Sequence, residues 1–301
     1  MSLVERAAKR LEELQRAGVS LPWNVGPSRA KSESQVPNDI RAGLASAAQR
    51  EGAESVAAED RVSRSVDIDV ARLAENGYIT PDAPRSQLAD EFRVVKRPLL
   101  ANATGTDGAP PIERANLIMV TSSVPGEGKT FVSVNLAMSI AMELDRRVLL
   151  IDADPSRPAV LNRLGLPPSS GLLDALTDST IDLSSLIMRT NVERLSLLPA
   201  GTANTKATEL LASVTMQRLV EDLAARYSDR IVIFDGPPLL PSTESRVLAT
   251  HMGQIVFVVE AARTRQSVVS EALSTIESCP VVLPMLNKTR GASGSYGYYG
   301  Y

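Results

Sequence analysis

The chain has 301 residues, which is long enough for one α/β domain of about 200 residues with short additions at its ends. Its 32 Lys and Arg residues stand against 35 Asp and Glu residues, so the net charge of -3 lacks the basic excess that nucleic-acid binding requires. One cysteine and one histidine exclude a Cys/His zinc site, and no apolar run approaches the roughly 20 residues of a membrane-spanning helix. We therefore expect a cytoplasmic protein that does not bind nucleic acid.

The N-terminal third predicts a helix followed by a linker. In residues 1–20, Val4, Ala8, Leu11 and Leu14 recur at helical spacing among charges of both signs, which favours docking to a protein over insertion into a membrane. Residues 21–66 are rich in Ser, Ala, Glu, Pro and Gly and show no sustained period. We interpret them as a flexible, disordered linker.

Residues 67–290 are interpreted as one domain in which strands and helices alternate. Short β-branched runs predict strands at residues 116–121, 147–152, 195–199, 230–235, 254–260 and 281–287, and helical segments lie at 129–143, 207–227 and 266–278. The alternation predicts a doubly wound α/β fold, a mostly parallel sheet with helices on both faces. Ligands of such folds bind beyond the carboxyl ends of the strands.

The first predicted strand runs into Thr-Ser-Ser-Val-Pro-Gly-Glu-Gly-Lys-Thr at residues 121–130 and then into a helix. The two glycines let the backbone turn its N–H groups toward phosphate oxygens, and the helix N-terminus adds a favourable dipole. We interpret the segment as a P-loop, although Ser123 replaces the usual first glycine. We expect the nucleotide to contact Pro125, Gly126, Glu127, Gly128, Lys129, Thr130 and Phe131.

Three aspartates stand at the ends of two later strands. Asp152 and Asp154 follow one strand, and Asp235 ends another in a Walker B arrangement. We expect Mg²⁺ to be held by Thr130, Asp152 and Asp235. Lys129 would stabilise the transferring phosphate, and Asp154 is the candidate general base, with Asp152 as the alternative. Asn287, after the last strand, is expected to touch the nucleotide base.

Residues 291–301 form a tail that contains four of the six tyrosines of the chain. Its glycines and serines predict enough flexibility to enter an active site. Beside a phosphoryl-transfer site, the economical interpretation is that these tyrosines accept phosphate. The predicted acceptors are Tyr296, Tyr298, Tyr299 and Tyr301.

Three segments resemble the Walker A, A′ and B motifs of bacterial P-loop tyrosine kinases. They are the loop at residues 123–130, the Asp-Ala-Asp segment at 152–154 and the Asp-Gly-Pro-Pro segment at 235–238. Residues 2–10 and 91–102 are most similar to the tyrosine autokinases of exopolysaccharide loci associated with exosortase and PEP-CTERM systems. The resemblance implies an autokinase that uses ATP and Mg²⁺ and regulates exopolysaccharide synthesis and export. It also implies a separate transmembrane chain-length regulator that activates the chain and recruits it to the inner face of the membrane, and a phosphotyrosine phosphatase that resets it.

The sequence departs from this family in two places. The arginine that commonly follows the second aspartate by two residues is Ser156 here, with Arg157 beside it. The Glu-x-x-Arg-x-x-Arg helix that the family uses for subunit contacts is represented by Asp90, Arg93 and Lys96. We expect these three residues to support a homo-oligomer.

Two other functions stay open at this point. A positioning or partitioning ATPase of the deviant Walker type would carry a signature lysine where this chain has Val124, and it would not need a tyrosine tail. A non-catalytic adaptor would bind nucleotide and present its tail to another kinase. The retained Lys129, Thr130 and three aspartates argue against the adaptor.

Overall fold

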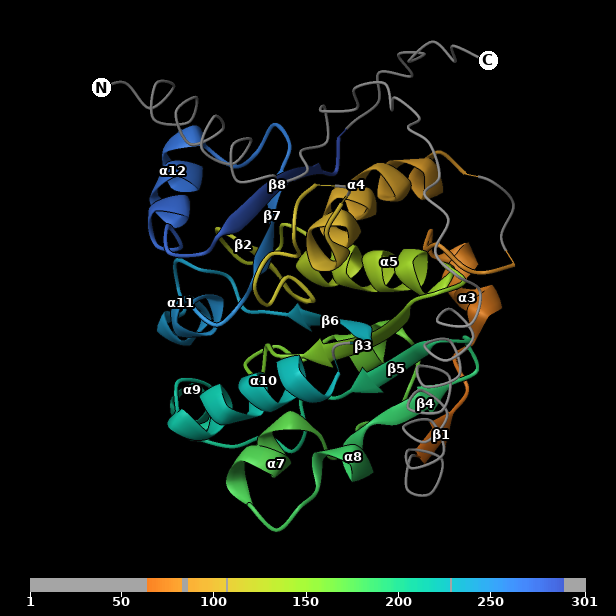
Figure 1. Cartoon of the computed structure of the whole chain (residues 1–301), viewed down its shortest axis with the longest axis vertical. Helices are drawn as coiled ribbons and strands as arrows, with labels where there is room; N and C mark the ends of the chain where they lie inside the picture. Colours follow the sequence, from red (N-terminus) through yellow and green to blue (C-terminus); the bar gives the residue numbers. More distant parts are fainter. Residues whose placement is uncertain (1–63, 83–85, 107, 228, 290–301) are drawn as a thin grey trace, which may run out of the picture.

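The fold is a single sheet of eight strands covered by helices on both faces (Figure 1). It comes from a computed structural model that describes residues 64–82, 86–106, 108–227 and 229–289. The strands lie in the order β1-β4-β5-β3-β6-β2-β7-β8, and every neighbouring pair is parallel except β4 and β5. Their bounds are β1 Arg64–Val66, β2 Leu117–Ser122, β3 Arg147–Asp152, β4 Met188–Thr190, β5 Leu195–Leu198, β6 Arg230–Asp235, β7 Gln254–Glu260 and β8 Val281–Asn287. This architecture confirms the predicted fold class.

The helices divide between the two faces, with α4 and α5 on one side of the sheet in Figure 1 and α10, α11 and α12 on the other. None of the helices in the described ranges has the length and apolar content needed to cross a membrane. Their bounds are α3 Val70–Glu75, α4 Gln87–Thr104, α5 Lys129–Ala141, α6 Val160–Arg163, α7 Leu172–Thr177, α8 Leu183–Leu186, α9 Ala207–Leu211, α10 Val214–Arg226, α11 Thr243–Ala249 and α12 Gln266–Ser274.

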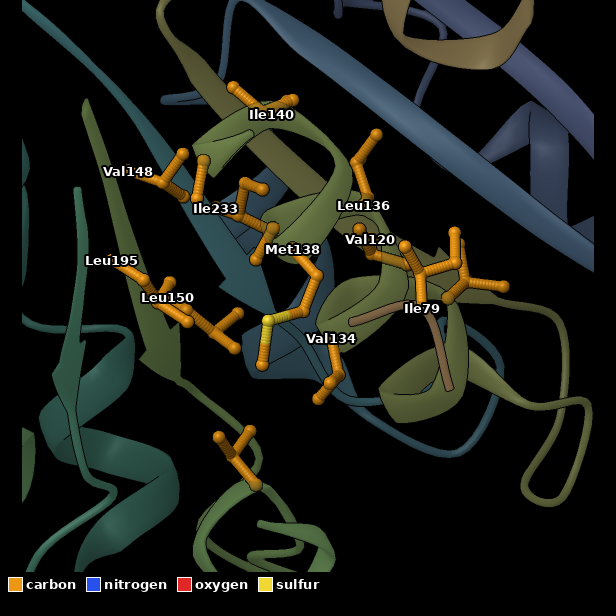
Figure 2. Packing of buried hydrophobic residues seen from close by; sticks show 14 of the residues in the cluster. Ile79, Val120, Val134, Leu136, Met138, Ile140, Val148, Leu150, Leu195 and Ile233 are labelled. Carbon is orange, nitrogen blue, oxygen red and sulfur yellow. The ribbon is translucent and has the colours of Figure 1, made fainter. Parts of the chain in front are cut away.

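Each central strand is apolar on both faces because helices cover both. Along β6, Ile231 and Ile233 pack on the side of α5, whereas Val232 and Phe234 pack on the opposite side. Figure 2 shows the first of these two cores, where Met138 of α5 lies near strand residues of β3 and β6. Burying each large side chain contributes roughly 1.5–3 kcal/mol, so the two cores fix the strand ends in place.

The predicted helix at 207–227 is two helices in the structure. Ser213 lies between α9 and α10, and its hydroxyl accepts a hydrogen bond from the Met216 N–H at 3.1 Å. A serine in this position is a favourable N-cap, so it starts a new helix instead of continuing the old one. The prediction of one continuous helix was therefore wrong.

The last residues of the predicted linker are part of the sheet. Residues 64–66 form β1, which pairs in parallel with β4, and the Ile68 N–H just after them donates to Asn191 Oδ1 at 2.8 Å. Three-residue strands give too short a pattern to detect in a sequence. The predicted helix at 1–20, the linker up to residue 63 and the tail at 291–301 lie outside the described residues, so these predictions stand as made.

Helix α4 carries the residues predicted to mediate self-association, and they do not share one exposed face. Asp90 and Arg93 form an exposed ion pair one turn apart. Lys96 is buried, and its ammonium group donates to the Ser139 carbonyl of α5 at 2.5 Å and pairs with Glu143 at 2.5 Å. Positions i and i+6 differ by about 120° around a helix, so Lys96 faces the domain. The assignment of Lys96 to a subunit contact is corrected, and that of Asp90 and Arg93 remains a prediction.

Candidate active site

A cavity of about 820 Å³ opens at the carboxyl ends of the central strands, around the P-loop. The strand order places β2 in the middle, with β6 and β3 on one side of it and β7 and β8 on the other. Loops from both sides therefore meet at the N-terminus of α5. Apart from Glu127, every residue predicted to bind nucleotide lines this cavity: Pro125, Gly126, Gly128, Lys129, Thr130, Phe131 and Asn287.

Two glycines give the P-loop its shape. Gly126 and Gly128 have φ angles of 92° and 102°, values that residues with a Cβ rarely adopt. A Cβ at Gly126 would meet nothing within 4 Å, but a Cβ at Gly128 would lie 2.0 Å from Asn287 Nδ2. Only glycine allows the end of β8 to approach the loop so closely.

The end of β8 holds the P-loop through its carbonyl groups. Asn287 Nδ2 donates to the Glu127 carbonyl at 2.8 Å, and Lys288 Nζ donates to the Gly126 carbonyl at 2.6 Å. Lys288 also pairs with Glu260 at 3.2 Å. These contacts with β8 hold the loop in one conformation. Asn287 therefore has a structural role in addition to its predicted contact with the nucleotide base.

The side chain of Glu127 is turned away from the cavity, which explains why it does not line it. It is 1% exposed, and its carboxylate accepts hydrogen bonds from the Val124 N–H at 2.8 Å, the Glu260 N–H at 3.2 Å and the Thr264 hydroxyl. The carboxylate thus ties the P-loop to the end of β7. Only the backbone of Glu127 can therefore contact the nucleotide.

The three predicted metal ligands converge behind the P-loop. Asp235 accepts hydrogen bonds from the Thr130 hydroxyl at 2.7 Å and the Ser133 hydroxyl at 2.9 Å. Asp152 is the register neighbour of Asp235 across β3 and β6, and one of its oxygens accepts from the backbone N–H groups of residues 159 and 160. Ser133 was missed, although its position one helical turn after Lys129 places it on the same face of α5.

Burial shapes the electrostatics of these two aspartates. Both are 1% exposed, and burial raises the pKa of Asp152 to about 7, with the nearby charge of Asp235 as a second cause. Burial also raises the pKa of Asp235, to about 6, against the hydrogen bonds from Thr130 and Ser133. A hydroxyl and two carboxylates are the hard oxygen ligands that Mg²⁺ prefers, so this donor set fits the predicted ion.

Asp154 is the predicted aspartate that faces the cavity. One of its oxygens lies 3.8 Å from Lys129 Nζ, and both side chains are about nine-tenths buried. Burial raises the pKa of Asp154 above its usual value, and the charge of Lys129 lowers it by a smaller amount. Of the two candidates for the base, Asp154 has the access to a substrate, because Asp152 does not line the cavity.

Several cavity residues were not found by sequence reasoning. Tyr78, which follows α3, lines the cavity beside Phe131 of α5, and Arg163 comes from the end of α6. Glu244 lies in the first turn of α11, is 7% exposed, and its charge raises the pKa of Asp154. None of these residues belongs to a motif, so only the packing of distant segments brings them together.

Comparison with known proteins agrees with this geometry. The family model of the AAA domain matches residues 115–280. The chain is 29% identical to the tyrosine-protein kinase YwqD of Bacillus subtilis (strain 168) over 233 residues, which are 76% of this chain and 93% of that protein. It is 31% identical over 216 residues to the succinoglycan biosynthesis transport protein ExoP of Rhizobium meliloti (strain 1021), which covers 70% of this chain but 26% of that longer protein.

Solved structures show the same fold. The kinase domain of the Escherichia coli tyrosine kinase ETK matches with a TM-score of 0.56 and 24% identity, over 75% of this chain and 97% of that one. The kinase domain of VpsO matches with a TM-score of 0.51 and 29% identity, over 67% of this chain and 100% of that one. In both comparisons the match takes in almost the whole of the solved chain.

Proposed function

The chain belongs to the AAA domain family and is a tyrosine kinase of the bacterial P-loop type, and on this premise we propose that it transfers the γ-phosphate of ATP to its own tail. The observation that carries the proposal is the position of Asp154. It puts a buried carboxylate with a raised pKa in the cavity, 3.8 Å from the P-loop lysine. The proposed acceptors are Tyr296, Tyr298, Tyr299 and Tyr301.

In the proposed mechanism the P-loop amides and Lys129 hold the phosphates of ATP and stabilise the charge of the transferring group. The acceptor hydroxyl has an ordinary pKa near 10, so its attack needs a base to take the proton as the new O–P bond forms. Asp154 serves as that base, and the bond between the γ-phosphorus and the bridging oxygen breaks to release ADP. Burial raises the pKa of Asp154, which makes its carboxylate a stronger base.

Thr130, Asp152 and Asp235 would hold the Mg²⁺ ion that offsets the charge of the phosphates. Asp152 and Asp235 are buried and do not line the cavity. Asp235 is linked to the cavity through Thr130, whose hydroxyl donates to it, and Asp152 lies next to Asp235 across β3 and β6. We assign Asp152 a metal-binding and positioning role, because its carboxylate also fixes the backbone at residues 159 and 160.

The biological setting belongs to the same proposal. We infer that the chain regulates exopolysaccharide synthesis and export, since one relative is a succinoglycan biosynthesis transport protein and others are tyrosine-protein kinases. A separate transmembrane chain-length regulator would activate it at the inner face of the membrane, and a phosphotyrosine phosphatase would reset the tail. The narrower resemblance to exosortase-associated autokinases remains a prediction.

The test separates binding from transfer in two variants. Lys129→Met should abolish transfer, and calorimetry on the wild type should show binding of Mg²⁺-ATP. Asp154→Asn should keep ATP affinity within a few-fold but slow transfer to tyrosine by about 10²–10⁴-fold, the usual contribution of a general base. As a matched control, the exposed Asp222→Asn on α10 should change neither quantity. Transfer at the wild-type rate in Asp154→Asn would remove Asp154 from the mechanism.

A further inference from the structure

The cavity has two sides, and the P-loop lies between them. On the β8 side, Asn287 and Lys288 contact the P-loop carbonyls. On the β3 side, Asp154 and Arg157 follow the strand, and Arg163 ends α6. The order β3-β6-β2-β7-β8 keeps these two groups apart, because β2 and its P-loop stand in the middle.

The position of the base decides which side the acceptor uses. A proton acceptor must lie within hydrogen-bond reach of the attacking hydroxyl, so the tyrosine has to approach on the side of Asp154. The γ-phosphate must then point toward the β3 side, and the rest of the nucleotide extends over the P-loop toward β8. This arrangement leaves Tyr78 and Arg163 without a role in nucleotide binding, and it assigns the ring of Phe131, one of the predicted nucleotide contacts, to the acceptor instead.

Those groups suit an aromatic side chain that carries or receives a phosphate. Tyr78 and Phe131 form an aromatic wall, with ring centroids 5.1 Å apart and planes tilted by 48°. The wall is rigid, because the Ile79 N–H beside Tyr78 donates to the buried Asn135 of α5 at 2.7 Å. Aromatic rings favour tilted or offset contacts with a further ring at this spacing.

Arg163 adds charge to this wall. Its guanidinium group lies close enough to Tyr78 to lower the pKa of that hydroxyl, although burial, the larger effect, raises it. Arg163 and Arg157 are exposed at the mouth of the cavity, where a flexible segment can reach them. A guanidinium group has several N–H donors, so Arg163 would donate to the hydroxyl oxygen of the bound tyrosine before transfer and to the phosphate oxygens afterwards.

We propose that Tyr78, Phe131 and Arg163 form the acceptor subsite, which binds the tyrosine of a Gly- and Tyr-rich peptide and orients its hydroxyl toward Asp154. This inference rests on the proposed tyrosine-kinase function and adds the residues that select the acceptor. Tyr78 is a specificity residue here, and it does not itself receive the phosphate.

The experiment uses the full chain with all four tail tyrosines changed to phenylalanine, so that an added peptide with the sequence of residues 291–301 is the acceptor. In this parent, Tyr78→Ala and Arg163→Gln should each raise KM for the peptide by about tenfold, a loss equal to one charge-assisted hydrogen bond or aromatic contact. The Kd for ATP, measured by calorimetry, should change less than twofold. Arg218→Gln, an exposed change on α10, should alter neither value.

The outcomes are distinguishable. If KM for the peptide stays within twofold of the parent in both variants while labelling continues, the acceptor subsite is elsewhere. A parallel rise in the Kd for ATP would assign these residues to the nucleotide instead. If the parent labels no peptide and the wild type labels no tyrosine, the proposed function itself fails. Because Tyr78→Ala removes packing, Tyr78→Phe is the folded control and should keep most of the peptide affinity.

Discussion

Replacing each of the two P-loop glycines, Gly126 and Gly128, with alanine distinguishes the effect of backbone strain from the effect of losing the contact with β8. Both positions have φ near +100°, where an alanine is disfavoured by roughly 1–2 kcal/mol. At Gly126 that strain is the whole effect, because a Cβ there meets nothing. At Gly128 the Cβ also displaces the Asn287 amide from the Glu127 carbonyl, and the lost hydrogen bond adds about 1 kcal/mol.

We expect Gly126→Ala to weaken ATP binding by about 5- to 30-fold and Gly128→Ala by about 30- to 150-fold, since the nucleotide must restore the loop conformation. Calorimetry with Mg²⁺-ATP measures both. A double-mutant cycle adds the decisive comparison: Asn287→Ala should add little to Gly128→Ala, because the same hydrogen bond is already lost, but should be additive with Gly126→Ala. Equal losses in the two glycine variants, or additivity in both cycles, would refute the proposed clamp.

Two further predictions concern the buried charges. Asp152 has a folded-state pKa of about 7, above its unfolded value near 3.9, so the folded protein binds this proton more tightly. Without Mg²⁺, the free energy of unfolding should therefore fall by roughly 2–4 kcal/mol as the pH rises from about 4 to 7. In urea titrations Asp152→Asn should flatten this pH dependence. A wild-type stability that rises over this pH range would contradict the buried, protonated Asp152. Lys96→Met should lower the free energy of unfolding by about 1–2 kcal/mol, because its contacts with α5 are lost, and it should leave the oligomeric mass unchanged. Arg93→Glu should do the opposite: it should lower the mass measured by light scattering and leave the stability nearly unchanged. The reverse pattern would restore Lys96 to a subunit contact.

The sequence predicted the central sheet well for a physical reason. Strands β3, β6, β7 and β8 have the bounds expected from the sequence. For β3, β6 and β7 the reason is that a strand buried on both faces needs apolar residues at nearly every position, whereas β8 is a partly exposed edge strand that still carries an apolar run. The P-loop and the aspartates could also be located, since strand-to-helix connections in a parallel sheet bring its carboxyl ends together. These parts depend on local pattern alone.

Most of the parts that failed depend on contacts between distant segments. Strand β1 can be recognised only once its partner β4 is known. The cap at Ser213 is a local contact three residues long, and it was missed because a lone serine inside a helical pattern is a weak signal. Lys96 looks like a surface charge in the sequence, and only the packing of α4 on α5 shows that it is buried. Tyr78 reaches the cavity because Asn135 fixes the segment after α3 to α5, a contact between residues 56 positions apart.

The central claim is that this chain phosphorylates its own tail, and mass spectrometry of the purified protein after incubation with Mg²⁺-ATP tests it most directly. We predict phosphate on one or more of Tyr296, Tyr298, Tyr299 and Tyr301 in the wild type, and none in Lys129→Met. If the wild type hydrolyses ATP but labels no tyrosine, even with the cytoplasmic segment of a membrane regulator supplied, the account is contradicted and the chain acts as a nucleotide-controlled switch.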